Sequence, residues 1–495
     1  MAITYVEDVI YQSIVPVEDV IYKSIISKGL TNENDYIDGI LWGGNYWNPQ
    51  ANGGNITYSF WGEGSESFDD NLYIDGQTFQ EGWINKAYNW SSSEQNAVTN
   101  ALQQWSNIAN INFVATSDNN QSATFGFYKY DSNSYVSGSP LQNPSVDGAM
   151  TGPGSSANLP GIGYFDTESG AWNDQGLQQG GVNFWLLMHE IGHGLGLGHP
   201  HDDFGNSEIF PGVDDSGDSG DHGLNQKMWT IMSYHSEPDV SSNNFSYGHQ
   251  GTPMALDIAA IQYLYGANMS YKTDDDVYQL PDANEMGTFY SCIWDAGGTD
   301  EISNAGSNID SVINLNDAPL TGPNAGGYLS TPDGIYGGFT IANTVEIENA
   351  TGGNGSDKIT GNELDNVLIG GESNDTLIGG DGDDILTGSN PDYWNSGSGE
   401  YDTLTGGDGV DTFVLGDAWE AYYQDSGYAL ITDFNWQEGD QLRVHGSSSD
   451  YSFRHNNWFG GSSIDTAIYY QGDAIALLQD AYTSSTYISE DFTFV

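Results

Sequence analysis

The chain has 495 residues, of which 69 are acidic and nine are basic, and its formal net charge is −60. This length allows two or three domains with separate cores. The charge excludes nucleic acids and anionic membrane surfaces as partners, because both are polyanions. The single cysteine, Cys292, allows no internal disulfide, and no segment of the sequence is apolar enough to span a membrane. The many carboxylates are either solvated or hold calcium.

The first 30 residues contain a duplication. The segment 6–14 (VEDVIYQSI) returns with one change at 17–25. Pro16 and the β-branched residues oppose one continuous helix, so we predict a pro-segment or mobile arm over 1–30. A basic region followed by a long apolar run, typical of a secretory signal peptide, is missing here.

From residue 31 the pattern is that of a globular domain, which we expect to end at 268. Ser91, followed three residues later by Glu94, predicts a capped helix that continues to Ile108. An acidic, glycine-rich segment at 202–222 has irregular spacing and is interpreted as a solvated loop. Strands are expected at 55–60, 111–114 and 123–128.

Residues 189–200 read HEIGHGLGLGHP. On a helix, His189 and His193 lie one turn apart on the same face, so both imidazoles can reach one ion. Gly196 allows the chain to leave the helix in a left-handed conformation and to bring His199 back as third ligand. Glu190 lies beside His189, within reach of a water molecule at the fourth tetrahedral position. The spacing is the metzincin one, and it predicts a zinc site.

Four further features accompany this motif. His201 is a competing third ligand, but it breaks the spacing and is expected to be a solvated surface residue. Gly194 is expected to loosen the end of the helix, because a helical glycine costs up to about 1 kcal/mol relative to alanine. The sequence TIMSY at 230–234 follows His199 by about 30 residues and is interpreted as a turn that places a methionine under the imidazoles. A helix is predicted over 253–265.

A period of nine residues runs from Gly352 to Val414, interrupted at 388–396. The eighth position of each repeat is apolar and the sixth is mostly aspartate, which predicts short strands stacked into a parallel β-roll with an inward apolar ladder. Aspartates and glycine carbonyls of neighbouring turns are expected to chelate calcium. The repeat residues predicted to bind calcium are Gly353, Gly355, Asp357, Gly371, Asp375, Gly380, Gly382, Asp384, Asp402 and Asp411.

Taken together and in this order, the zinc motif, the methionine turn and the nonapeptides resemble the serralysins, secreted bacterial metalloendopeptidases. The resemblance covers roughly residues 35–495. It implies an α+β zincin/metzincin catalytic domain followed by a parallel β-roll, a calcium-binding β-solenoid. The expected organisation is an arm at 1–30, a catalytic domain at 31–268, a lead-in at 269–351, repeats at 352–415, and a cap with a secretion signal at 416–495.

The resemblance also implies roles for residues. His189, His193 and His199 would bind one catalytic zinc ion, Tyr234 would be an additional ligand and oxyanion donor, and Glu190 would be the general base. Further calcium ligands are implied for the lead-in, namely Asp295, Gly298, Asp300 and Glu348.

Two functions remain open from the sequence. The first is a secreted zinc-dependent endopeptidase, and the alternative is a calcium-dependent adhesin of the RTX (nonapeptide-repeat) type with a vestigial protease domain. The expected partners are protein or peptide substrates and the type I secretion machinery, reached through an uncleaved C-terminal signal ending in Asp491–Val495. Neither nucleic acid nor membrane insertion is expected, and the chain is expected to be a monomer.

Overall fold

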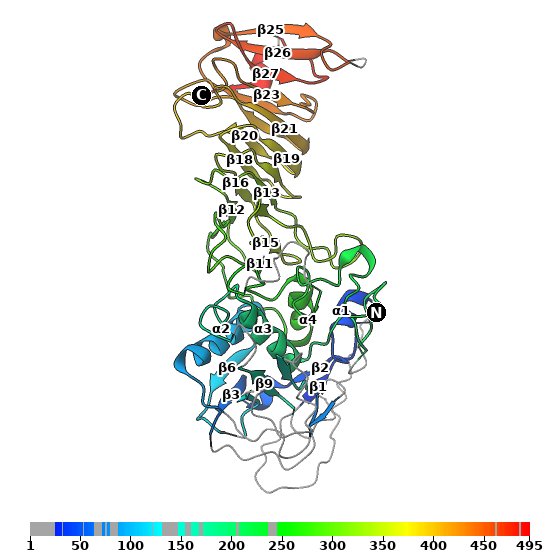
Figure 1. Cartoon of the computed structure of the whole chain (residues 1–495). Helices are drawn as coiled ribbons and strands as arrows, with labels where there is room; N and C mark the ends of the chain where they lie inside the picture. Colours follow the sequence, from blue (N-terminus) through cyan, green and yellow to red (C-terminus); the bar gives the residue numbers. More distant parts are fainter. Residues whose placement is uncertain are drawn as a thin grey trace. The chain divides into compact units, whose positions relative to one another are not determined.

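A computed structural model gives the structure of the chain (Figure 1). It describes residues 25–31, 33–52, 54–63, 72–74, 77–79, 88–120, 122–130, 147–153, 160–167, 172–203, 207–235, 245–460, 463–484 and 487–495. The chain divides into two compact units. The first holds residues 1–271, 284–294 and 318–327, and the second holds 272–283, 295–317 and 328–495.

The first unit is built on a five-stranded sheet in the order β6-β3-β7-β9-β8. The first four strands in this order run parallel, and β8 pairs antiparallel with β9. The sheet strands are β3 (Asn55–Trp61), β6 (Asn112–Ala115), β7 (Phe125–Tyr130), β8 (Gly148–Met150) and β9 (Ile162–Asp166). Two short pairs accompany it, β1 (Ile25–Ser27) with β2 (Asn45–Trp47) and β4 (Leu72–Ile74) with β5 (Gln77–Phe79).

Two long helices lie side by side against this sheet, α2 (Ser92–Ile108) and α3 (Val182–Leu195) (Figure 1). The capping box predicted for α2 is confirmed, because Ser91 Oγ accepts from the Glu94 N–H and Glu94 accepts from the Ser91 N–H. Trp105 of α2 and Phe125 and Phe127 of β7 are fully buried and form the core between helices and sheet. The other helical segments of this unit are α1 (Asp35–Gly39), α4 (Ala255–Tyr265) and the 3-10 turns Pro49–Asn52 and Asp221–Gly223, and β11 (Tyr290–Ile293) also belongs here.

The N-terminal arm falls only partly within the described residues. Residues 1–24 lie outside them, and with them lies nearly all of the duplicated segment. Ile25–Ser27 form β1 and pair antiparallel with Asn45–Trp47. The prediction that 202–222 is a solvated loop is only partly confirmed: Asp214, Asp215 and Asp221 are exposed, whereas Phe210 and Val213 are buried and Asp202 contacts His199. Cys292 is buried, as expected.

The second unit is the predicted parallel β-roll. One sheet has the order β10-β12-β16-β18-β20-β22-β24-β28, with every neighbouring pair parallel. The other has the order β14-β13-β17-β19-β21-β23-β27-β26-β25, parallel from β13 to β27 and antiparallel at both ends. Successive half-turns alternate between the two sheets, as the nine-residue period predicts.

The strands of the second unit are short, and all of them except β15 belong to the two sheets of the roll. They are β10 (Val277–Gln279), β12 (Glu301–Ser303), β13 (Ser311–Asn314), β14 (Thr331–Pro332), β15 (Gly338–Ile341), β16 (Asn349–Thr351), β17 (Lys358–Thr360), β18 (Val367–Gly371), β19 (Thr376–Asp381), β20 (Ile385–Ser389), β21 (Tyr401–Asp408), β22 (Thr412–Val414), β23 (Tyr428–Ile431), β24 (Gln441–Val444), β25 (Tyr451–Asn456), β26 (Asp465–Tyr470), β27 (Asp473–Leu478) and β28 (Phe492–Phe494), with the 3-10 turn Ser448–Asp450 and the helix α5 (Ile488–Asp491).

The apolar ladder at the eighth repeat position is the core of the roll. Its residues stack in register within each sheet and are fully buried: Ile359, Leu377 and Leu404 in one sheet, and Leu368, Leu386 and Phe413 in the other. Burying such side chains stabilises each by about 1.5–3 kcal/mol. The interruption at 388–396 begins at the end of β20 and continues into the connection to β21, so ladder partners on either side of it are 27 residues apart instead of 18.

No helix in the described parts of the chain is both long and apolar enough to cross a membrane. The C-terminal residues predicted to carry a secretion signal are part of the roll, since Phe492–Phe494 form β28 and pair with β24.

Candidate active site and calcium positions

Helix α3 carries His189, Glu190 and His193, and it ends where the motif predicts. Gly196 has φ +113° and ψ 20°, and its N–H donates to the carbonyls of Gly192 and His193. A Cβ at this position would lie 2.3 Å from the Asn45 carbonyl oxygen, so only glycine fits. The chain then turns back and brings His199 to the face of the helix that holds the other two histidines.

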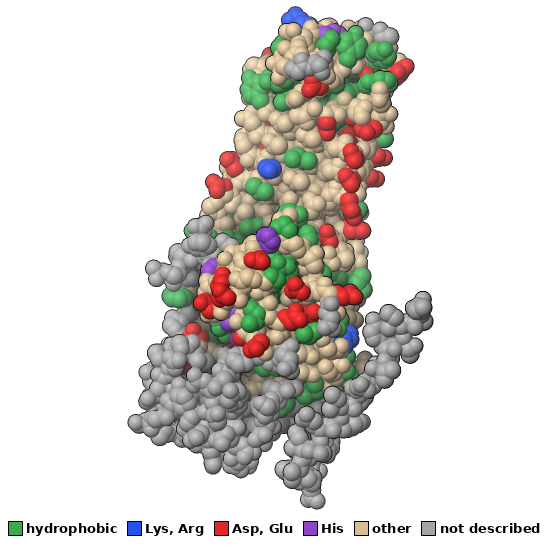
Figure 2. All heavy atoms as spheres, turned by 90° about the vertical axis from the view of Figure 1, so that its right-hand side faces the viewer, with side chains coloured by type: hydrophobic (Ala, Val, Ile, Leu, Met, Phe, Trp, Pro, Cys, Tyr) green, Lys and Arg blue, Asp and Glu red, His purple; other side chains and the backbone are tan. Residues whose placement is uncertain are grey.

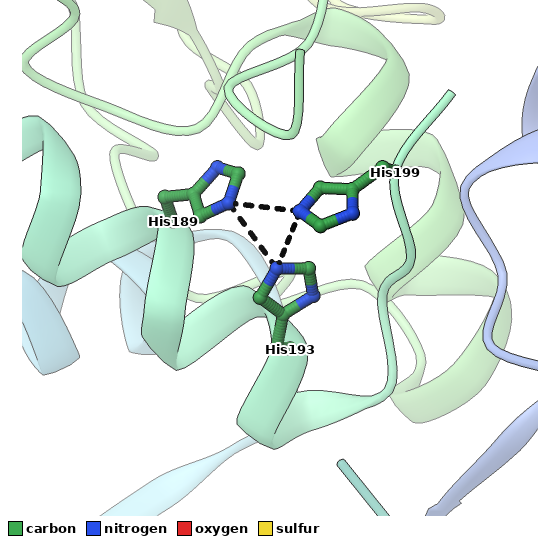
Figure 3. Close-up of side chains that lie close together, drawn as sticks. All are labelled: His189, His193 and His199. Atoms are coloured by element: carbon green, nitrogen blue, oxygen red, sulfur yellow. Dashed lines mark hydrogen bonds between the residues drawn. The ribbon is translucent and has the colours of Figure 1, made fainter. Parts of the chain in front are cut away.

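The three imidazoles converge on one point (Figure 3). The Nε2 atoms are 3.2 Å apart for His189 and His193, 2.9 Å for His193 and His199, and 3.3 Å for His189 and His199. A tetrahedral zinc ion with Zn–N bonds of about 2.0–2.1 Å separates its nitrogen ligands by about 3.3 Å. The spacing of the triangle therefore fits a zinc ion.

The other nitrogen of each ring has an oxygen partner. Nδ1 of His189 donates to the Ile231 carbonyl, Nδ1 of His193 to the Leu197 carbonyl, and Nδ1 of His199 to the Asp202 carboxylate, at 2.7–2.8 Å. Placing the proton on Nδ1 leaves the Nε2 lone pair directed at the shared point. Burial, followed by the neighbouring imidazoles, lowers the pKa of His189 and His199 well below the usual value, which keeps the rings neutral and able to bind metal.

Asp202 is a functional residue that the sequence reasoning missed. Its carboxylate is the only charged partner of the three rings among the described residues, and a carboxylate hydrogen-bonded to a ligating imidazole makes that imidazole more basic. The only signal in the sequence was an acidic residue three positions after His199, which is common in so acidic a chain.

Changing Asp202 to Asn should weaken zinc binding about 10–100-fold, because the charge that supports His199 is lost. Competition with a chromogenic chelator measures the dissociation constant. The matched control is Asp203→Asn, an exposed neighbour with no contact to the rings. Equal zinc affinity in the two variants would contradict the role of Asp202.

A turn at 230–233 adjoins the triangle, because the Ile231 carbonyl accepts from His189 Nδ1. Met232 is fully buried, and a Cβ at Gly192 of α3 would lie 2.8 Å from its Sδ. The turn is held by Asp257 of α4, whose carboxylate accepts from Thr230 Oγ1 (2.6 Å), the Ile231 N–H (2.7 Å) and the Met254 N–H (2.9 Å). Burial raises the pKa of Asp257 to about 7. Because Ile231 also binds the His189 ring, Asp257 acts on the site through this turn.

Glu190 is 4% exposed and lies against β8. A Cβ at Gly148 would be 3.2 Å from Glu190 Cγ and 3.3 Å from Oε1, so the glycine makes room for the carboxylate. Tyr234 is 44% exposed, and its ring centroid lies 4.6 Å from that of His199 and 5.5 Å from that of His189. The structure thus places Tyr234 against the rings of His189 and His199, and Glu190 follows His189 on α3.

The expectation for His201 was wrong. Its side chain is only 10% exposed, and its ring stacks on His199 at 4.9 Å and lies 4.8 Å from Tyr234. The proline between His199 and His201 and the turn that follows bring the second ring back over the first. Spacing alone does not reveal this stacking.

In the repeats, the aspartates predicted to bind calcium form two ladders, one on each edge of the roll. The backbone N–H of Asp357 donates to Asp375 and that of Asp375 to Asp402, at 2.7 and 2.8 Å. On the other edge the same bond joins Asp384 to Asp411, at 3.0 Å. These aspartates are buried, and the row of acidic side chains that Figure 2 shows along one edge of the roll consists of other, exposed residues.

The carboxylates of these ladders are buried and lie close to one another, which disfavours their charged form. Burial raises the pKa of Asp375 to about 9 and that of Asp384 to about 7, and the neighbouring carboxylates add to this increase. One buried oxygen of each of these two carboxylates has no hydrogen-bond partner among the described residues. The glycines of the same turns leave the room for the backbone, since a Cβ at Gly371 would lie 2.0 Å from the Gly353 oxygen. Of the other predicted glycines, Gly380 is in β19, Gly382 lies between β19 and β20, and Gly355 lies between β16 and β17.

The lead-in residues also come together. Asp295 and Asp300 lie within one small cluster with Asp276, which the sequence reasoning did not single out. Glu348 accepts from the Asp300 N–H at 2.7 Å. Gly298 adjoins them, and a Cβ there would lie 2.9 Å from the Asp300 carboxylate. Buried oxygens of this kind fit a hard cation such as calcium.

The fold and the histidine site define a domain with a three-histidine site of metal-binding geometry, followed in the chain by a parallel β-roll. A profile of the Matrixin family matches residues 84–207, and the profile described as Peptidase M10 serralysin C terminal matches residues 255–477. The chain is serralysin-like, as the sequence motifs predicted. It is 33% identical over 296 residues to a serralysin of Photorhabdus luminescens, covering 56% of this chain and 54% of that protein.

Other relatives show the same extent of similarity. A serralysin of Proteus mirabilis is 31% identical over 57% of this chain and 56% of its own length, and the metallopeptidase AprA of Pseudomonas marginalis is 32% identical over 54% of each chain. The chain spans about half the length of the curated relatives it matches.

Proposed function

We propose that the protein is a secreted, zinc-dependent endopeptidase. The observation that carries the proposal is the triangle of three Nε2 atoms of buried histidines at 2.9–3.3 Å, on and after the helix that also carries the buried Glu190. His189, His193 and His199 would hold the ion, with Tyr234 as an additional ligand. Zinc bound there acidifies water and polarises a carbonyl group.

Two side chains would carry out the proton transfer and stabilise the intermediate. Glu190 accepts a proton from the attacking water and delivers it to the amine nitrogen that leaves, as a general base and then a general acid. The Tyr234 hydroxyl donates a hydrogen bond to the oxyanion of the tetrahedral intermediate. Each step requires only a side chain that adjoins the histidine triangle.

The strand β8 offers a way to bind an extended peptide. It is the last strand in its sheet, and Gly148 adjoins Glu190. A substrate that added to this edge as a further strand would gain backbone hydrogen bonds regardless of its sequence. Its scissile bond would then lie in front of α3.

We further infer that the roll binds several calcium ions through the aspartate ladders and the lead-in cluster. Buried carboxylate oxygens without partners and carboxylates with raised pKa are the supporting observations. Calcium reaches the millimolar level outside cells, which agrees with secretion. Export through a type I secretion channel remains a prediction, and finding the protein in the cells instead of the medium of a producing culture would contradict it.

Removal of zinc should abolish hydrolysis of casein, and stoichiometric zinc should restore it, with calcium held at millimolar concentration throughout. The adhesin alternative is not favoured, because it needs neither Glu190 nor the complete ligand set. Casein hydrolysis that survives complete removal of zinc would rule out the proposed reaction.

A further inference from the structure

A lysine lies close to the histidine triangle. Lys227 precedes the turn at 230–233, and its backbone N–H donates to the His235 carbonyl at 3.0 Å. Its Nζ is 3.3 Å from the centroid of the Trp185 ring. Trp185 is on α3, one turn before His189, and the two rings are 5.3 Å apart. The ammonium group is therefore separated from a predicted zinc ligand by a single aromatic ring.

The indole of Trp185 holds this arrangement in place. Its Nε1 donates to the Ile231 carbonyl at 3.2 Å, the same oxygen that accepts from His189. Trp185 is 8% exposed, so the ring has little freedom to move. The face of an indole attracts a cation, which fixes the position of Nζ relative to the site.

The charge of Lys227 is not balanced within the described part of the chain. No carboxylate there lies within ion-pair distance of its Nζ, whereas Lys129 contacts Glu94 and Lys272 contacts Asp276 at 2.7 Å. This contrast is notable in a chain with 69 acidic and nine basic residues. Burial lowers the pKa of Lys227 to about 7, which shows how little its environment favours the charge. A buried cation is costly unless an anion accompanies it.

We propose that Lys227 determines substrate specificity by binding the carboxylate of an aspartate or glutamate near the scissile bond. This inference rests on the proposed peptidase function. The ammonium lies at most 8.6 Å from the centre of the His189 ring, from the two distances of 3.3 and 5.3 Å through Trp185. At about 3.3 Å per residue, an extended substrate covers that length in about three residues.

A substrate carboxylate would pair with this ammonium. The charge-assisted hydrogen bond between them would be stronger at the half-buried Lys227 than at an exposed surface. This preference for acidic substrates would oppose the long-range electrostatics, because a net charge of −60 repels acidic peptides. High salt should therefore speed association of acidic peptides and leave the local preference in place.

The test uses the zinc- and calcium-loaded full chain and peptides that differ only in Glu, Gln or Lys at each of the three positions on either side of the cleaved bond. We expect kcat/KM for Glu to exceed that for Gln by about tenfold or more at one of these positions. Lys227→Met should reduce this ratio to about one, Lys227→Glu should favour the Lys peptide, and Lys227→Arg should retain the preference for Glu. The control is Lys358→Met, an exposed lysine of β17.

The outcomes separate the two proposals. If no peptide is cleaved by the wild-type protein, the peptidase function itself fails. If peptides are cleaved but Glu and Gln are equivalent at all six positions, or if Lys227→Met keeps the wild-type ratio, the inference about Lys227 is overturned. Should Lys227→Met fail to fold, binding of the uncleaved Glu and Gln peptides to Glu190→Gln, with and without Lys227→Gln, gives the same comparison without turnover.

Discussion

Glu190→Gln should lose nearly all peptide hydrolysis and keep its zinc. General base catalysis contributes about 10²- to 10⁴-fold, and glutamine has the same shape but cannot accept the proton. The shape matters because the side chain fits closely against Gly148. The measurements are kcat/KM on a peptide substrate and zinc content by atomic absorption. Tyr234→Phe should cost less, since it removes one hydrogen bond to the oxyanion and leaves the base intact.

The matched control for this variant is Glu208→Gln, an exposed glutamate of the same unit. It should retain both zinc and activity. A Glu190→Gln protein that holds zinc and keeps more than about a tenth of the wild-type rate would exclude Glu190 as the general base.

Removing calcium should unfold the β-roll of the full chain. Without a cation, the buried carboxylates of the two ladders repel one another at close range, and the glycine-rich turns add little apolar burial. Hydrogen exchange followed by mass spectrometry should show protection lost across 352–414 in chelator. Protection should return at millimolar calcium, the affinity range of extracellular modules.

Substitution of one ladder aspartate tests whether its carboxylate takes part in calcium binding. Asp384→Asn should raise the calcium concentration needed for protection of its edge of the roll, whereas Asp381→Asn, an exposed aspartate in the same repeat, should not. Identical exchange of the roll with and without calcium would show that the carboxylate ladders need no cation.

Local sequence signals predicted much of this protein because each acts over a few residues. The spacing of His189 and His193 follows from 3.6 residues per turn, and the left-handed conformation of Gly196 follows from its missing Cβ. The nine-residue period predicted both the parallel register of the roll and its buried apolar ladder, because each turn repeats the geometry of the one before it.

Gly194 shows where local reasoning fails. A helical glycine weakens an isolated helix, and on that ground α3 was expected to be loose at its end. In the structure a Cβ at this position would lie 2.5 Å from Met150 Cε, so the glycine allows α3 to pack closely against β8. The expectation was wrong because propensity counts only the helix, whereas the packed neighbour decides whether a side chain fits.

The residues that support the site depended on contacts between distant segments. Asp257 reaches the turn at Thr230 across 27 residues of sequence, and Lys227 meets Trp185 across more than 40. The sequence around Asp257 or Lys227 does not predict which turn or aromatic ring its side chain will contact. The spacing of metal ligands and the repeat period are set within one helix or one turn, so the sequence by itself determines them. Burial, the hydrogen bonds that the ligand imidazoles make through Nδ1, and unpaired charge depend on how distant segments pack, so only the tertiary structure decides them.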